Sequence, residues 1–393
     1  MAWNNNRYFF GIRKYNKTAA RLSYMVCGFL FVVFSMVYLT VFQKDLIDAL
    51  HLSTAKGNSE FKILPAAIIV TVILMILKWG LNLLMRLRGS VHALAYIPSF
   101  LGLVTMTAFG RDVYLGESRY IWWWLMPVLT AGFVTVTVAV RKHMKPETNE
   151  CSTLGIVINN IALMLIMCVG TMCLGNTDRY FHNVLRMESM ISEGNNMEVL
   201  NVAGKSSKTT RTMTALRMMA MAKEGMTGEW RFRFPQYFKS EGMFFDSDSM
   251  KTLRFTNDSV YALLGDRPAA GESRMQYLKR LSIEGGDSCR MAVDYYLAGL
   301  MLDKKMDEFA EAIVKTSDTG RYYREAILMY KEMNPQWEYV AADNDSTYQS
   351  RLKEYRDKQR NIKYKSETEE RNRMKLEFGD TFWWYYDYQK KLF

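Results

Sequence analysis

The sequence contains few of the side chains that bind metals or form disulfide bonds. Four histidines are present, and none has another histidine three or four residues away, so a histidine-based metal site would need ligands from separate segments. Three of the five cysteines lie inside apolar runs, and no two cysteines have metal-ligand spacing with a histidine nearby. The sequence therefore predicts no metal, no cofactor and no disulfide framework.

Motifs for phosphate or acyl-transfer chemistry are also missing. No GxxxxGK[ST] loop is present, and the stretch GKSSKTT at 204–210 lacks both the upstream glycine and a preceding strand. No GxSxG nucleophile elbow occurs. The sequence does not exclude a Ser/His/Asp triad, because the members of a triad need not be close in sequence. These absences favour a binding or structural protein over an enzyme.

Acidic residues are scarce in the first part of the chain. Residues 1–175 contain 16 Lys and Arg but 7 Asp and Glu, whereas residues 176–393 contain 35 basic and 33 acidic residues. Nearly all of the formal net charge of +11 therefore lies among the hydrophobic runs of the first part. That pattern is typical of membrane orientation charges and not of a nucleic-acid surface. We predict no nucleic-acid partner.

What the first part does contain is long apolar runs. A membrane-spanning helix needs about 20 mostly apolar residues. Five runs meet that requirement: 22–41, 63–85, 91–109, 121–140 and 154–174. The third is the weakest, because it holds His92 near its start and Pro98 inside. We predict an all-α fold in which residues 1–175 form a five-helix transmembrane domain in contact with membrane lipid.

The charges of the loops between these runs predict an orientation. Ten basic residues lie on the side of the N-terminus, and five lie in the loops of the opposite side. By the positive-inside rule the N-terminus is cytoplasmic, and an odd number of spans then places residues 176–393 outside the cytoplasm. If the third run did not span, this tail would be cytoplasmic and the loop charges would fit less well.

Residues 176–345 are predicted to form a helical-repeat domain. The clearest unit is DSCRMAVDYYLAGLMLDKKMDEFAEAIVKT, Asp287–Thr316, in which helices over 289–302 and 306–315 would pack as an antiparallel pair. The small residue Gly299 would let a partner helix approach closely. Stacked pairs of this kind form tetratricopeptide-like (TPR-like) solenoids, although the strict 34-residue pattern is not present.

Two aromatic segments of the tail are candidates for binding a protein partner. One lies in GEWRFRFPQYFKSEGMFF, for which the alternative is a buried connector between helix pairs. The other is the C-terminal FGDTFWWYYDYQKKLF, whose side chains would form an exposed patch unless they dock onto the repeat domain or at the membrane interface. The candidate residues are Trp230, Phe232, Phe234, Tyr237, Trp383 and Trp384.

A charged stretch precedes the aromatic C-terminus. Residues 346–376 are dense in charge of both signs, and they predict a solvated helix with ion pairs four residues apart. Together with the aromatic segment they make up a third predicted region, residues 346–393.

Three stretches of the tail are similar to one known family. They are LRMMAMAKEGMTGEWRFRFPQYF, VYALLGDRPAAGESRMQYLKRL and the helix-pair segment through Asp307–Ile313. Over residues 178–335 the chain resembles an uncharacterised family of bacterial multi-pass membrane proteins with an extracytoplasmic TPR-like helical tail. The resemblance implies a protein of the bacterial inner (cytoplasmic) membrane with a cytoplasmic N-terminus and a periplasmic C-terminal domain. It carries over no catalytic residue.

Polar residues in or near the predicted spans are functional candidates by default. They are Lys78, Arg111, Asp112, Asn159, Asn160, Asp178, Arg179 and His182. For Lys78 the alternative is snorkelling to the membrane interface, and for the two asparagines it is interhelical hydrogen bonding. The remaining five lie at the outer ends of the spans, where they could converge into a catalytic group.

These observations leave three hypotheses from different classes. The first is an integral membrane scaffold or assembly subunit whose extracytoplasmic helical-repeat tail binds a protein partner in a larger membrane complex. The second is a subunit of a transport or secretion complex. A pore-lining polar stripe on one span would favour it, and the sequence shows no such stripe. The third is a membrane enzyme that acts on an envelope lipid or glycan through the group around His182. We favour the first.

Overall fold

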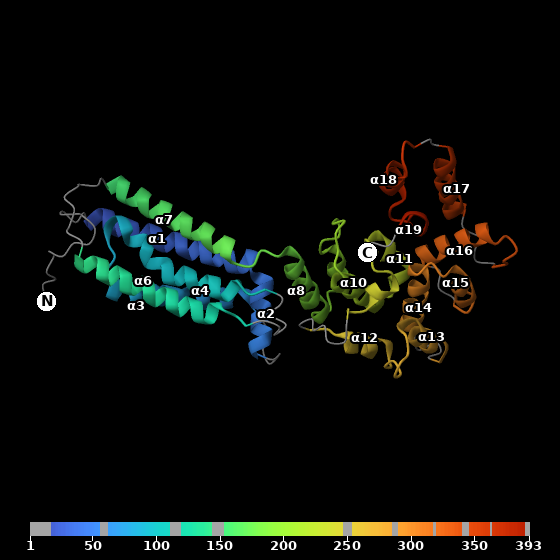
Figure 1. Ribbon diagram of the computed structural model, residues 1–393, viewed down its shortest axis with the longest axis horizontal. Helices are drawn as coiled ribbons and strands as arrows, with labels where there is room; N and C mark the ends of the chain where they lie inside the picture. Colours follow the sequence, from blue (N-terminus) through green and yellow to red (C-terminus); the bar gives the residue numbers. More distant parts are fainter. Residues whose placement is uncertain are drawn as a thin grey trace. The chain divides into compact units, whose positions relative to one another are not determined.

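The computed structural model describes most of the chain. The described residues are 17–55, 62–110, 119–143, 153–246, 254–284, 290–316, 320–339, 346–361 and 364–389. All regular secondary structure within these ranges is helical, so the predicted all-α fold is confirmed for them. The chain divides into two compact units, Met1–His182 and Asn183–Phe393 (Figure 1).

The first unit is a bundle of long helices. Its elements are α1 (Lys17–Val37), a π-helical turn (Tyr38–Phe42), α2 (Lys44–Ala55), α3 (Ile63–Met85), a 3₁₀ helix (Gly89–Tyr96), α4 (Ile97–Thr107), α6 (Trp122–His143) and α7 (Thr153–Leu174). In Figure 1, α1, α3, α4, α6 and α7 run side by side. Contacts of α1 with α7, of α3 with α4 and of α4 with α6 agree with that arrangement.

Five segments of this unit are long and apolar enough to cross a membrane. They are Ala20–Phe42, Ile63–Met85, Gly89–Thr107, Trp122–Val140 and Leu154–Leu174, each within two residues of a predicted run. The third is divided, because the 3₁₀ helix gives way to α4 with Pro98 in its first turn, where the missing N–H is not needed. Large apolar side chains such as Phe29, Trp79 and Trp124 are exposed in this unit.

The second unit contains the shorter helices. They are α8 (Arg179–Ser192), which begins in the first unit, α9 (Asn196–Asn201), α10 (Arg211–Lys223), α11 (Thr227–Trp230), two 3₁₀ turns (Arg231–Arg233 and Lys239–Met243), α12 (Asn257–Leu264), α13 (Arg274–Glu284), α14 (Arg290–Leu302), α15 (Met306–Ile313), α16 (Arg321–Met333), α17 (Ser346–Asn361), α18 (Glu367–Phe378) and α19 (Phe382–Tyr388). One core cluster extends from Met187 to Tyr388 and ties these helices together.

The predicted helix pair is present as α14 and α15, with bounds within two residues of those predicted. Lys304 adopts a positive φ of 59° in the turn that joins them. Gly299 permits the close approach predicted for it, because a Cβ at that position would lie 2.8 Å from the Sδ atom of Met275 on α13. Helices α14, α15 and α16 pack in consecutive order along the chain.

The charged segment 346–376 forms two helices, α17 and α18, and the prediction of one solvated helix is wrong. Ser366 starts the second helix, because its hydroxyl oxygen accepts a hydrogen bond from the N–H of Glu369 at 3.2 Å. Each helix also buries apolar side chains in the core, so only part of its surface is solvated. Ion pairs four residues apart are present, as between Lys358 and Glu354 at 2.8 Å.

The aromatic C-terminal segment forms α19 and docks into the core of the second unit. Trp383 is 0% exposed, and its Nε1–H donates to the carbonyl oxygen of Glu325 at 2.8 Å. The Glu325 carboxylate accepts from the N–H of Phe382 at 2.7 Å and from Nε of Arg321 at 2.9 Å. Burial raises the pKa of Glu325 to about 7, although the nearby Arg321 opposes the rise.

This raised pKa predicts that the stability of the second unit depends on pH. The folded pKa of Glu325 lies above its value of 4.5 in an unfolded chain, so between these values the folded state binds more protons on this group. We expect the contribution of Glu325 to the free energy of unfolding to fall by roughly 2 kcal/mol as pH rises from about 5 to 8. The Glu325→Gln variant lacks this titration but keeps all other titratable groups. Its pH profile is therefore the control for the profile of the wild-type protein. Denaturation of both proteins across this range would contradict the prediction if the two pH profiles were parallel.

Candidate functional site

A cleft in the second unit brings the two predicted aromatic segments together. Its walls come from the loop before α10, from the segment after α11, from the end of α18 and from α19. The lining residues are Gly204, Lys205, Ser206, Ser207, Phe232, Arg233, Phe234, Pro235, Gln236, Tyr237, Lys375, Gly379, Trp384, Tyr385 and Gln389.

The charged residues that line the cleft are all basic. Lys205, Arg233 and Lys375 are exposed, and no acidic residue is among the lining side chains. The guanidinium carbon of Arg233 lies 4.3 Å from the centre of a Trp230 ring, and Nζ of Lys375 lies 5.5 Å from that of Trp384. Aromatic faces hold such cations in place without neutralising them. The cleft therefore presents positive charge to an anionic group.

Hydrogen bonds hold the walls of the cleft in position. The Tyr237 hydroxyl donates to the carbonyl oxygen of Ser207 at 2.7 Å, which joins two of the walls. Nε1–H of Trp384 donates to the carbonyl oxygen of Arg371 at 3.2 Å, which ties α19 to α18. Because these hydrogen bonds fix the walls, binding in the cleft would not need to order these segments.

The volume of the cleft limits what it can hold. It encloses about 210 Å³, whereas sites for small-molecule ligands usually enclose about 300–1,000 Å³. A cleft of this size suits one or two side chains or the carboxyl end of a peptide. Its chemistry, aromatic walls with a basic rim, suits an acidic peptide segment.

The structure places four of the six predicted partner-binding residues in the lining of this cleft: Phe232, Phe234, Tyr237 and Trp384. Phe232, Phe234 and Trp384 are nearly buried, so they contribute walls more than exposed surface. Trp230 lies next to the cleft, against Arg233. Trp383 does not line it and is fully buried, so no partner can contact Trp383 in the folded state.

The three basic residues of the rim were not among the predicted site residues. Lys205 belongs to the GKSSKTT stretch, whose sequence was compared only with that of a phosphate-binding loop. Lys375 belongs to the charged stretch, where one lysine cannot be distinguished from its neighbours. Arg233 offered the one usable signal, since it alternates with aromatic residues in WRFRFPQYF.

In the first unit, Lys78 lies against two tyrosine rings. Its Nζ atom is 4.6 Å from the ring centre of Tyr96 and 5.8 Å from that of Tyr24. The His92 ring packs edge-on against Tyr24, with ring centres 4.0 Å apart. The Tyr96 hydroxyl and Nε2 of His92 are buried and have no hydrogen-bond partner among the described residues. Lys78, Tyr24, His92 and Tyr96 are called the lysine cluster below.

Asn159 and Asn160 join α7 to the 3₁₀ helix. Nδ2 of Asn160 donates to the carbonyl oxygen of Gly89 at 2.8 Å, and its Oδ1 accepts from the N–H of Ala93 at 2.7 Å. Nδ2 of Asn159 donates to the carbonyl oxygen of Ser90 at 2.6 Å. Both asparagines therefore form interhelical hydrogen bonds, which was the alternative to a functional role in the sequence analysis.

Of the remaining polar candidates, the structure describes Asp178, Arg179 and His182, which lie at the start of α8. Arg111 and Asp112 lie outside the described residues. Arg179 begins α8, and the Asp178 carboxylate accepts from the N–H of Tyr180 at 2.9 Å near the start of that helix. These contacts are local to the connection into α8.

His182 approaches a carboxylate that the sequence did not single out. Its Nδ1 lies 3.9 Å from Oδ2 of Asp45 on α2, and its Nε2 lies 3.2 Å from the carbonyl oxygen of Asn176. Within the described ranges no group of three or more His, Cys, Asp or Glu side chains could hold a metal ion.

Comparison with known proteins finds one family whose model matches part of the chain. A model of a family of unknown function, DUF6057, matches residues 272–389, which include α13 to α19 and two of the four walls of the cleft. This match agrees with the resemblance to an uncharacterised family, and it overlaps the resembling residues over 272–335. No curated protein and no solved structure matches the chain.

Proposed function

We propose that this chain is an integral membrane scaffold or assembly subunit of the bacterial inner membrane. In this proposal the five apolar segments of the first unit cross the membrane and the N-terminus is cytoplasmic. The second unit is a TPR-like helical domain in the periplasm that binds an acidic segment of a protein partner in its cleft. The partner belongs to a larger membrane complex.

One observation carries the binding role. Two aromatic segments about 150 residues apart in sequence converge on one cleft whose three charged lining residues are all basic. Clusters of aromatic and arginine side chains are typical of the energetic centres of protein interfaces. Basic residues at the rim also raise the association rate of an acidic partner and disfavour basic ones.

The membrane role is supported by composition and by surface chemistry. The five segments have the length and hydropathy of spanning helices. Apolar side chains such as Phe29 and Trp124 are exposed in the first unit, which is costly in water and favourable in lipid. Basic residues are in excess in the segments on the same side as the N-terminus, and this excess supports the proposed orientation.

The cleft is tested by photo-cross-linking in intact cells. A photoreactive amino acid replaces Ser206, which lines the cleft, and in a control protein it replaces Ser350, an exposed residue of α17. We expect the Ser206 position alone to capture a periplasmic or membrane partner through an acidic peptide. Reversal of two rim charges, Lys205→Glu with Lys375→Glu, should lower the yield roughly tenfold, because like charges would then oppose binding.

The matched control for the charge reversal is Lys279→Glu with Lys353→Glu, which changes two exposed lysines outside the cleft. Equal capture from Ser206 and Ser350, or equal yields from the two double variants, would contradict binding in the cleft. A captured partner that is cytoplasmic would contradict the orientation.

Two other functions are proposed as less favoured alternatives. A subunit of a transport or secretion complex would make the first unit the binding surface. A membrane enzyme acting on an envelope lipid or glycan rests on the approach of His182 to Asp45. Capture of a partner through the cleft favours the scaffold over both.

A further inference from the structure

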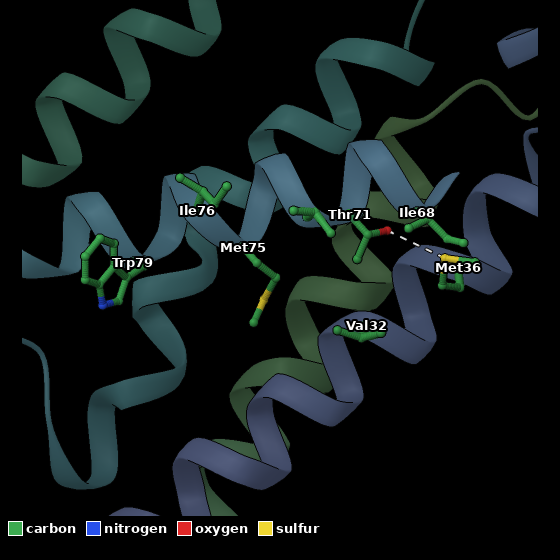
Figure 2. A pocket seen from close by; sticks show the side chains of 8 residues that line it. Val32, Met36, Ile68, Thr71, Met75, Ile76 and Trp79 are labelled. Carbon is green, nitrogen blue, oxygen red and sulfur yellow. Dashed lines mark hydrogen bonds between the residues drawn. The ribbon is translucent and has the colours of Figure 1, made fainter. Parts of the chain in front are cut away.

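The cleft of the second unit differs in its lining from the groove between α1 and α3 in the first unit. The groove encloses about 550 Å³ and is lined by apolar and aromatic side chains and by Thr71, without a charged residue (Figure 2). The cleft combines aromatic side chains with Lys205, Arg233 and Lys375, which are called the basic rim below. A ligand that matches the cleft therefore carries an apolar group and an anionic group close together.

The members of the basic rim come from different walls of the cleft. Lys205 lies in the loop before α10, Arg233 ends the 3₁₀ turn after α11, and Lys375 lies on α18. In the ranges that the structure describes, no carboxylate forms an ion pair with any of them. One anionic group of a ligand can therefore approach cations from three segments of the chain.

A further cation lies behind one aromatic wall. The guanidinium carbon of Arg217 is 4.8 Å from the ring centre of Phe234, and Arg217 is 2% exposed. Its Nη2 donates to the carbonyl oxygens of Val202 at 2.9 Å and Ala203 at 3.3 Å, just before the loop that lines the cleft. Burial lowers the pKa of Arg217 to about 10, so the side chain keeps its charge at neutral pH. A buried charge is poorly screened by water, so it adds to the positive potential at the cleft.

The size of the cleft restricts how a peptide can supply both groups. The volume of about 210 Å³ suits one or two side chains. In an extended peptide, neighbouring side chains point to opposite faces, and the next side chain on the same face lies about 7 Å further along. An internal acidic residue beside an inserted apolar residue would therefore direct its carboxylate away from the cleft. An acidic side chain inserted by itself would lose its hydration against Phe232, Phe234 and Trp384, which costs free energy.

The carboxyl-terminal residue of a peptide avoids both difficulties, because its side chain and its α-carboxylate are attached to the same Cα atom. The side chain can enter between the aromatic walls while the α-carboxylate stays at the opening, beside the basic rim. Capture of a terminal carboxylate is one of the recurring modes by which protein domains recognise peptides.

We propose that the cleft binds the carboxyl-terminal residue of the protein partner, with an apolar side chain between the aromatic walls and the α-carboxylate at the basic rim. The proposal rests on the proposed function, since it takes the cleft as the partner-binding surface of the second unit. It adds that the recognised element is a chain end and not an internal acidic segment.

The test compares three fluorescein-labelled hexapeptides by fluorescence anisotropy with the full-length protein in nanodiscs. The first is Gly-Ser-Gly-Ser-Gln-Phe with a free carboxyl end, the second is Gly-Ser-Gly-Ser-Glu-Phe with an amidated end, and the third is the glutamine peptide with an amidated end. The first two carry the same net charge and differ in the position of the carboxylate. We expect the first to bind about tenfold more tightly than either of the others, the effect of one charge-assisted contact. Replacing its terminal phenylalanine with alanine should weaken binding about tenfold, because most of the buried apolar surface is lost.

Charge reversal shows whether the peptides bind in the cleft. Lys205→Glu with Lys375→Glu should weaken binding of the first peptide about tenfold, whereas Lys279→Glu with Lys353→Glu, which changes two exposed lysines outside the cleft, should not. If the first two peptides bound equally and the rim reversal weakened both, recognition of a chain end would be overturned while binding of an acidic segment would stand. Equal binding of the third peptide and the first would overturn recognition of the carboxylate. Absence of saturable binding for all three peptides, or equal binding by the two double variants, would overturn the cleft as a binding surface and with it the proposed function.

Discussion

Replacing Trp383 with alanine is expected to destabilise the second unit by about 3–5 kcal/mol, the usual cost of removing a fully buried tryptophan. The side chain is 0% exposed and packs against Tyr355, with ring centres 6.0 Å apart. Its Nε1–H also satisfies the carbonyl oxygen of Glu325 in the interior. The substitution therefore leaves both a cavity and an unpaired polar group, and it releases α19 from α16.

Hydrogen exchange of the full-length protein, read by mass spectrometry on peptides from α14 to α16, measures this loss. The matched control is Leu376→Ala on the neighbouring α18, because Leu376 is 87% exposed and its loss should change stability by less than about 0.5 kcal/mol. If both variants exchanged at the same rate, α19 would not be docked as described. The cross-linking experiment on the cleft would then lose its structural basis, since Trp384 and Tyr385 belong to the same helix.

Local patterns were sufficient to predict part of the helices. Hydropathy and helical spacing are properties of neighbouring residues, so the five apolar segments and the pair α14–α15 could be predicted from the chain alone. The break before α18 could have been found too, since Ser366 followed by Glu369 is a helix-start pattern within the charged stretch. There the density of charge hid the capping signal.

The fate of the aromatic C-terminus could not be predicted in this way. From the sequence, Trp383 and Trp384 fit either an exposed binding patch or a docked segment, and docking is the favoured interpretation. The choice depends on Glu325, which lies 58 residues before Trp383 and contacts it through space. The cleft has the same origin, because its walls come from segments between residues 204 and 389. Long-range packing decides such features, and composition does not encode it.

The lysine cluster shows a similar limit. Sequence position marked Lys78 as a charged residue within an apolar run, which left snorkelling and function as alternatives. Its neighbours come from α1 and from the 3₁₀ helix, and they include His92, which the sequence did not connect with Lys78. The chemistry of the cluster, a cation among aromatic rings without a carboxylate among the described residues, follows from the bundle.

Replacing Arg231 with methionine is expected to stabilise the second unit by about 1–4 kcal/mol, as in other proteins where an apolar residue replaces a buried charge. Arg231 is 1% exposed, and burial lowers its pKa to about 10, so the guanidinium still carries its charge at neutral pH. Nη1–H donates to the sulfur of Met218 at 2.8 Å, a weak acceptor, and Nε and Nη2 have no partner among the described residues. Methionine would keep the contact with Met218 and remove the cost of burying the charge.

The comparison variant is Arg356→Met, for which the opposite sign is expected. Arg356 pairs with Glu332 and Asp387, both at 2.9 Å, so its loss leaves two carboxylates without their cation and should destabilise the unit by about 1–3 kcal/mol. Hydrogen exchange of the same peptides measures both variants. A loss of stability in Arg231→Met would mean that an anion pairs with the guanidinium in solution. The search for an anion in the core of the second unit would then begin between Arg231 and Tyr295, whose hydroxyl is likewise buried without a partner among the described residues.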